Sequence, residues 1–132
     1  RMKQHNENAI AVSNYLSNHP KIEKVFFPGN DKRHKEIAEK QMDGFGGMMS
    51  FVIDSDINGV KTFLKNLNLF TLAESLGGVE SLIEHPAIMT HASIDPSIRE
   101  KLGISETLLR ISVGIEDVDD LISDLDQALS KI

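Results

Sequence analysis

The chain has 132 residues, with 14 basic against 20 acidic side chains, a net charge of −6 and no cysteine. This length fits one domain, and a hydrophobic share of 40% is typical of a soluble globular domain rather than a disordered one. The acidic balance disfavours nucleic acid and anionic membranes as partners. The lack of cysteine excludes disulfides, thiolate zinc sites and a cysteine nucleophile.

The start of the chain carries no signal-peptide core, and no apolar run approaches the roughly 18 residues of a membrane span. We therefore expect a cytoplasmic protein. The chain opens at Arg1, ahead of Met2 and already inside a helical pattern, which indicates a piece of a longer protein.

The first half of the chain alternates between helical and strand-like patterns. Met2, Ala9, Val12 and Leu16 recur on one helical face, and this helix is expected to end near Pro20. Short apolar runs bounded by glycine and turn residues predict strands. The predicted elements are a helix to residue 18, a strand at 22–27, a helix at about 33–42, a strand at 48–53, a helix capped by Asp56 that runs to Leu67, and a strand-like run at 69–73.

The second half contains a long stretch, residues 74–93, in which the periodicity weakens. It holds glycines, a proline and two histidines, and we predict an irregular segment of the kind that often carries function. A short helix at 97–102, a strand at 108–113 and a helix at 116–132 follow. The acidic first turn of that last helix suits the positive end of the helix dipole.

Strands that alternate with helices predict an α/β (α+β) sandwich over a single domain, residues 1–132. We expect a small mixed, mainly antiparallel sheet with helices on one face. No internal repeat and no linker interrupts the chain.

The histidines offer little sign of a metal site. No two of them lie four apart with a helical acid between them, and His85 and His91 are better read as structural hydrogen-bonding groups, so no metal is expected. The run 44–47 is read as a turn entering a strand rather than a phosphate loop. No nucleophile, base and orienting group are assembled by sequence spacing.

Arg110 is the most informative charged residue, because it lies in the middle of an apolar strand. Such an arginine is either exposed on one face of the sheet or paired with an anion. The anion is a bound carboxylate gripped by the planar guanidinium, or a side chain of this protein, with Glu84 and Glu116 as equal candidates. Ser75 precedes Gly77 and its neighbouring glycine, where a tight turn or a close approach of backbone amides to a ligand is expected.

Two long motifs carry a family resemblance. The run at residues 72–81 leads to 86–93, and the run at 102–105 leads to 109–116. Together they resemble the Cys/Met-metabolism PLP (pyridoxal phosphate) enzymes, which include cystathionine γ-synthase, cystathionine γ-lyase, cystathionine β-lyase and methionine γ-lyase. The resemblance covers the whole chain and implies the C-terminal domain of a fold-type I PLP enzyme.

The resemblance also implies roles for four residues in substrate binding. Arg110 matches the arginine that pairs with the substrate α-carboxylate, and Thr90 matches a residue near that arginine. Ser75 matches the serine beside the cofactor lysine and the substrate. Glu74 matches a position that separates family members, and a glutamate there resembles the γ-synthases and γ-lyases, whose substrates carry a distal amino group.

The chain departs from the full family pattern because it lacks the Ser-x-Thr-Lys stretch that holds the cofactor lysine. It also lacks the tyrosine that stacks on PLP. We therefore expect the large PLP-binding domain to be missing, so that this fragment is inactive, holds no catalytic residue and binds no cofactor. The parent enzyme, a lyase or transferase, would bind both PLP and an amino-acid substrate: cystathionine, homocysteine, cysteine or activated homoserine.

By the same resemblance the parent is expected to be a homotetramer and this fragment a monomer or a weak dimer. Other readings are a stand-alone amino-acid-binding regulatory module, a pure oligomerisation domain, and a parent with cystathionine β-lyase or methionine γ-lyase activity.

Overall fold

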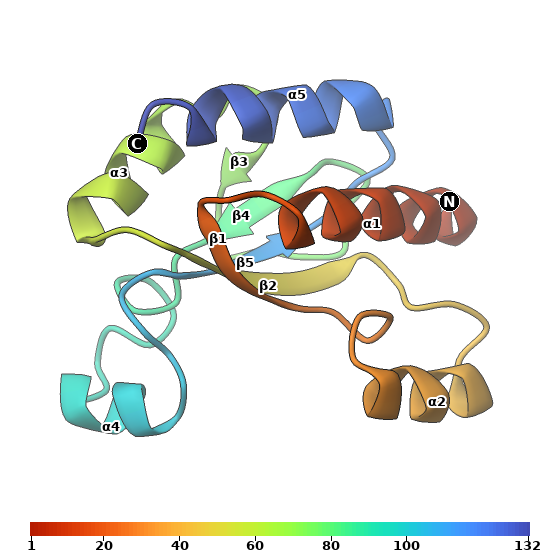
Figure 1. Cartoon of the computed structure of the whole chain (residues 1–132), viewed down its shortest axis with the longest axis horizontal. Helices are drawn as coiled ribbons and strands as arrows, with labels where there is room; N and C mark the ends of the chain where they lie inside the picture. The colour runs from red at the N-terminus through yellow and green to blue at the C-terminus, as the bar shows by residue number, and fades with distance from the viewer.

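A computed structural model describes every residue from Arg1 to Ile132 and shows a layer of helices lying over one β-sheet (Figure 1). No helix is both long and apolar enough to pass through a membrane. In chain order the elements are α1 (Met2–Ser17), β1 (Ile22–Phe26), α2 (Lys32–Gln41), β2 (Met48–Ile53), α3 (Ile57–Lys65), β3 (Thr71–Leu72), β4 (Leu82–Glu84), α4 (Pro96–Lys101), β5 (Leu108–Ser112) and α5 (Val118–Leu129).

The sheet has five strands in the order β1-β2-β5-β4-β3. All neighbours are antiparallel except β3 and β4, which are parallel, so the predicted mixed, mainly antiparallel sheet is confirmed. The central strand β5 comes late in the chain and joins the β1–β2 pair to the β3–β4 pair. In this register Arg110 on β5 lies opposite Ser50 on β2 and Glu84 on β4.

Three helices, α1, α3 and α5, cover one face of the sheet, whereas α2 and α4 lie apart from them on the other side (Figure 1). The covering helices bury an apolar stripe, and each large side chain taken out of water stabilises the fold by about 2 kcal/mol. In contrast, α4 buries no residue and α2 buries only Ala38. The core consists of Ala9, Val12, Leu16, Phe27, Met49, Phe51, Ile53, Val60, Phe63, Phe70, Ile83, Leu109, Ile111, Val113, Leu121, Leu125, Ala128 and Leu129.

Aspartates begin four of the five helices. Asp31, Asp56, Asp95 and Asp117 each accept a hydrogen bond from an amide of the first turn, which satisfies donors that the helix itself leaves free. The cap predicted at Asp56 is therefore present.

At the C-terminal end of α5, the Lys21 ammonium donates to the carbonyl oxygen of Leu129, 2.8 Å away.

The predicted elements occur in the structure in the predicted order, with differences at residues 74–93 and 69–73. Residues 74–93 were expected to be irregular, and this is wrong for Leu82–Glu84, which form β4. All three residues of β4 are buried, so no alternation of apolar and polar residues marks it as a strand. Only its pairing with β3 on one side and β5 on the other identifies this segment as a strand. The run at 69–73 also narrows to the two residues Thr71 and Leu72.

Candidate functional site

The site is built around Arg110, which leaves the sheet on the face opposite the helix layer. Successive side chains of a strand point to opposite faces, and the neighbours Leu109 and Ile111 are fully buried in the core. The side chain of Arg110 is 25% exposed, and its Nη2 lies 2.7 Å from Oε2 of Glu84. The N–H bond is not aligned with that oxygen, so the contact is an ion pair rather than a linear hydrogen bond.

Glu84 is the buried anion of the site, with a side chain that is 1% exposed. Its second oxygen, Oε1, accepts a hydrogen bond from the Thr90 hydroxyl. The Thr90 oxygen in turn lies 2.7 Å from Nδ1 of His91. A carboxylate removed from water is costly unless it is paired, and here both oxygens have a partner of suitable charge or polarity.

The loop that precedes β4 also reaches Arg110. Nη2 of Arg110 donates to the main-chain carbonyl oxygens of Glu74 and Ser75, at 3.3 and 3.4 Å. The side chains of Glu74 and Ser75 are exposed and make no hydrogen bond or ion pair. The remaining guanidinium nitrogens, Nε and Nη1, donate to no group of the protein, so three N–H bonds are left for a ligand.

Gly77 fixes the path of this loop. Its φ of +77° lies in the left-handed region, where a side chain would be strained. Its N–H donates to Oγ of Ser112, 2.8 Å away and two residues beyond Arg110 on β5. The glycine therefore holds the loop against the strand that carries the arginine.

The structure thus brings the four predicted site residues together with Glu84 into one cluster, the Arg110 cluster. Arg110, Glu84 and Thr90 take part through their side chains, and Glu74 and Ser75 through their main chain. Glu84 was weighed from the sequence only as one partner for the arginine. No local sequence pattern separated Glu84 from Glu116; the pairing of β4 with β5 places Glu84 opposite Arg110.

Glu116, the other sequence candidate for the partner of Arg110, has a different role. Its carboxylate accepts from the amide and the hydroxyl of Ser81, at 2.7 and 2.9 Å. The Ser81 hydroxyl oxygen also accepts from the amide of Gly114 at 2.8 Å. Glu116 therefore links the start of β4 to the end of β5. Of the two acids that the sequence left open as partners of Arg110, the structure pairs Glu84 with it.

His19 and His34 each lie within 4.0 Å of one aspartate, Asp126 and Asp31, but no group of three or more potential ligands is arranged to hold a metal. His85 is fully buried, with Nε2 at 2.7 Å from the carbonyl oxygen of Glu106. Burial lowers the pKa of His85, and the Glu106 carbonyl only partly opposes this effect. The imidazole is thus a neutral hydrogen-bonding group of the interior.

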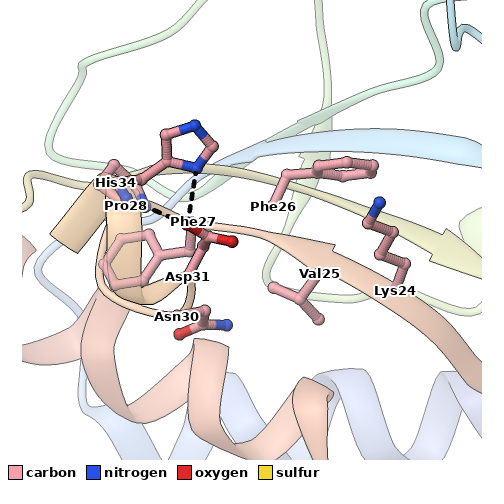
Figure 2. A pocket seen from close by; sticks show the side chains of 8 residues that line it. All are labelled: Lys24, Val25, Phe26, Phe27, Pro28, Asn30, Asp31 and His34. Carbon is pink, nitrogen blue, oxygen red and sulfur yellow. Dashed lines mark hydrogen bonds and ion pairs between the residues drawn. The ribbon is translucent and has the colours of Figure 1, made fainter.

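An open surface pocket lies away from this cluster, between β1 and the start of α2 (Figure 2). Its volume is about 660 Å³, and its lining includes Lys24, Phe26, Asp31 and His34. The Lys24 ammonium lies 4.6 Å from the centre of the Phe26 ring, and the Asp31 carboxylate accepts from the amide of His34. Lys24 and Asp31, the charged groups of this pocket, therefore each have a partner in its lining. We therefore place the candidate site at Arg110, where a buried charge meets free donors.

The chain matches a family of known enzymes over nearly its whole length. A profile described as Cys/Met metabolism PLP-dependent enzyme matches residues 1–130. The chain is 54% identical to cystathionine gamma-lyase of Dictyostelium discoideum, with 99% of this chain and 34% of the relative covered. It is 52% identical, with the same coverage, to cystathionine beta-lyase of Lactococcus lactis subsp. cremoris.

A solved structure gives the same result for the fold. The crystal structure of cystathionine gamma synthase from Xanthomonas oryzae pv. oryzae in complex with cystathionine superimposes with a TM-score of 0.93 at 47% identity. The match covers 99% of this chain and 34% of that chain. This chain spans about a third of the length of the curated relatives it matches.

Proposed function

The chain belongs to the family of PLP-dependent enzymes of cysteine and methionine metabolism, and we propose that it is the C-terminal, substrate-binding domain of a cystathionine γ-synthase or γ-lyase. In this proposal Arg110 binds the α-carboxylate of the amino-acid substrate. The observation that carries it is the arginine itself: one nitrogen is anchored by a buried carboxylate, and the other two are free of protein partners.

A planar guanidinium suits this task because its donors match the two oxygens of a carboxylate. Anchoring at Nη2 removes side-chain freedom before the substrate arrives, so less entropy is lost on binding. Holding the carboxylate orients the amino acid for reaction, and good positioning lowers a barrier by on the order of several kcal/mol.

The Arg110 cluster does not fit PLP itself. It contains no lysine to hold the cofactor covalently, and the free donors of its one cation are assigned here to the substrate carboxylate. We therefore propose that residues outside this chain hold PLP in the full-length protein. By the same argument the isolated chain is inactive and binds no cofactor.

Identity does not separate the possible activities, because relatives named as γ-lyase and β-lyase lie at 54% and 52%. Glu74 supports the γ-synthase or γ-lyase proposal. Its exposed carboxylate adjoins Ser75, whose carbonyl contacts Arg110, so it lies near the proposed carboxylate site. There it would attract the distal ammonium of cystathionine. Ser75 and Thr90 are assigned to the same substrate-binding site, Ser75 through its carbonyl contact with Arg110 and Thr90 through its contact with Glu84.

The test uses the full-length protein that contains this chain, with cystathionine as substrate. Arg110→Gln removes the positive charge and the planar guanidinium, and we expect KM to rise at least about a hundredfold, since a charge-assisted bidentate contact is lost. Arg110→Lys is the matched variant, because it keeps the charge without the paired guanidinium donors, and an intermediate KM is expected. Wild-type KM in Arg110→Gln would exclude the carboxylate role.

A second experiment addresses the missing cofactor domain. We expect the isolated chain to give no visible absorbance of lysine-bound PLP and to sediment as a monomer or a weak dimer. The full-length protein, which we propose to be a cytoplasmic homotetramer, should show that absorbance. Lysine-bound PLP in the isolated chain would contradict the division of labour proposed here.

A further inference from the structure

We propose that Glu84 is a positioning residue, which holds the Arg110 guanidinium in the orientation that receives the substrate carboxylate, and that Thr90 and His91 fix Glu84 from behind. The inference rests on the proposed role of Arg110 and adds the group through which that arginine is set.

The first step is the burial of the Glu84 carboxylate. It is 1% exposed and lies on β4 directly opposite Arg110 in the strand register. The strand that carries it is fully buried and pairs with β3 on one side and β5 on the other. The charge that Arg110 contacts is therefore buried on a backbone that sheet pairing holds in place.

The second step is the direction of the hydrogen bonds. The Thr90 hydroxyl has one hydrogen, and it donates this hydrogen to Oε1 of Glu84. The Thr90 oxygen must then accept from Nδ1–H of His91, 2.7 Å away. Both hydrogen bonds in the series from His91 through Thr90 to Glu84 therefore donate toward the carboxylate. Each bond strengthens the next, so Oε1 of Glu84 is stabilised independently of Arg110.

The third step distinguishes positioning from competition. A carboxylate that competed with the substrate would occupy the free edge of the guanidinium. Instead, Glu84, Glu74 and Ser75 all meet the same nitrogen, Nη2, and leave Nε and Nη1 without protein partners. The pair therefore restrains the arginine while donors remain for a second carboxylate.

The experiment compares Glu84→Gln with wild type in the full-length holoenzyme, using glycine and glycinamide as competitive inhibitors. The glutamine keeps the shape and can still accept from Thr90, but it lacks the charge. We expect the inhibition constant of glycine to rise about tenfold, because a charge-assisted anchor is lost. The constant for glycinamide, which has no carboxylate, should stay within about twofold.

Two further variants show whether the effect passes through the arginine. In an Arg110→Gln background, Glu84→Gln should raise the glycine constant no further. Glu116→Gln is the matched control, because Glu116 is also a hydrogen-bonded carboxylate of this region but contacts Ser81 instead. It should leave the ratio of the two constants unchanged.

The outcomes separate the two proposals. The positioning role is overturned if Glu84→Gln leaves the inhibition constant of glycine unchanged or lowers it, or raises the constant of glycinamide equally. This holds even where Arg110→Gln weakens the binding of glycine but not of glycinamide. If Arg110→Gln does not alter the ratio of the two constants, the proposed carboxylate site is wrong, and this inference is wrong with it.

Discussion

Two buried carboxylates on opposite sides of the sheet serve the molecule in different ways. Asp124 on α5, 5% exposed, accepts from the amides of Asn68, Leu69 and Phe70 at 2.8 to 3.2 Å and from the Gln127 side chain at 3.1 Å. Glu84 has one hydroxyl donor and one arginine. A charge satisfied by backbone amides is fully used inside the fold, whereas a charge balanced by a partly exposed arginine leaves donors for a ligand.

The pKa of Asp124 reflects the same contrast. Burial acts to raise the pKa of this carboxyl group, but the amides of Leu69, Asn68 and Phe70 together hold it below its usual range. Its stabilising contribution is therefore complete above the ordinary carboxyl range and is lost as pH falls through the lowered pKa of the folded state.

The largest effect is expected from Asp124→Ala. This change leaves buried amides between α3 and β3 without an acceptor, and the free energy of unfolding should fall by about 3 kcal/mol. Urea titration measures it. Asp119→Ala, an exposed position on the same helix, should cost less than about 1 kcal/mol. Because the first change acts through a carboxylate, the gap between Asp124→Ala and wild type should narrow in acid, and a gap independent of pH would contradict this account.

The second largest effect is expected from Arg110→Gln, which acts on the other buried carboxylate, Glu84. It leaves the Glu84 charge buried without its cation, and we expect a loss of about 2 kcal/mol in unfolding free energy, moderated because the arginine is partly exposed. The double variant Arg110→Gln with Glu84→Gln should recover most of this loss. A double variant no more stable than Arg110→Gln would mean that the pair contributes nothing to stability.

Thr90→Val tests the support behind Glu84. The valine keeps the shape of the side chain but removes the hydroxyl, and the expected cost is about 1 kcal/mol because Glu84 retains Arg110. Denaturant unfolding measures it. A cost equal to that of Asp124→Ala would show that the two carboxylates depend on their donors alike.

The smallest effect concerns His85, the neighbour of Glu84 in sequence. Its pKa is lowered in the folded state, chiefly by burial, so the unfolded chain binds the proton more tightly. Stability should be complete above the ordinary histidine range, near pH 6.5, and should decline as pH falls from there through the lowered folded pKa. Thermal melts of wild type and His85→Gln across this interval measure it; equal slopes would show that His85 does not titrate on unfolding.

The sequence predicted most helices and strands because their apolar spacing repeats over many residues, as in α1 and α5. It missed β4 because three consecutive buried residues carry no period. The resemblance to the enzyme family predicted substrate-binding roles for Arg110, Glu74, Ser75 and Thr90, and the structure places these four residues close together. The partner of Arg110 required the register of β4 against β5, which depends on residues 26 positions apart and on no local pattern.

The strand order has a consequence for synthesis on the ribosome. β5, which lies in the middle of the sheet, is translated after all the other strands. Until it emerges, the edges of β2 and β4 that β5 covers in the folded sheet have no pairing partner. The apolar side of α5, which closes the core over them, arrives later still. The nascent domain therefore cannot complete its sheet and core before β5 and α5 are made, and until then its unpaired strand edges favour aggregation.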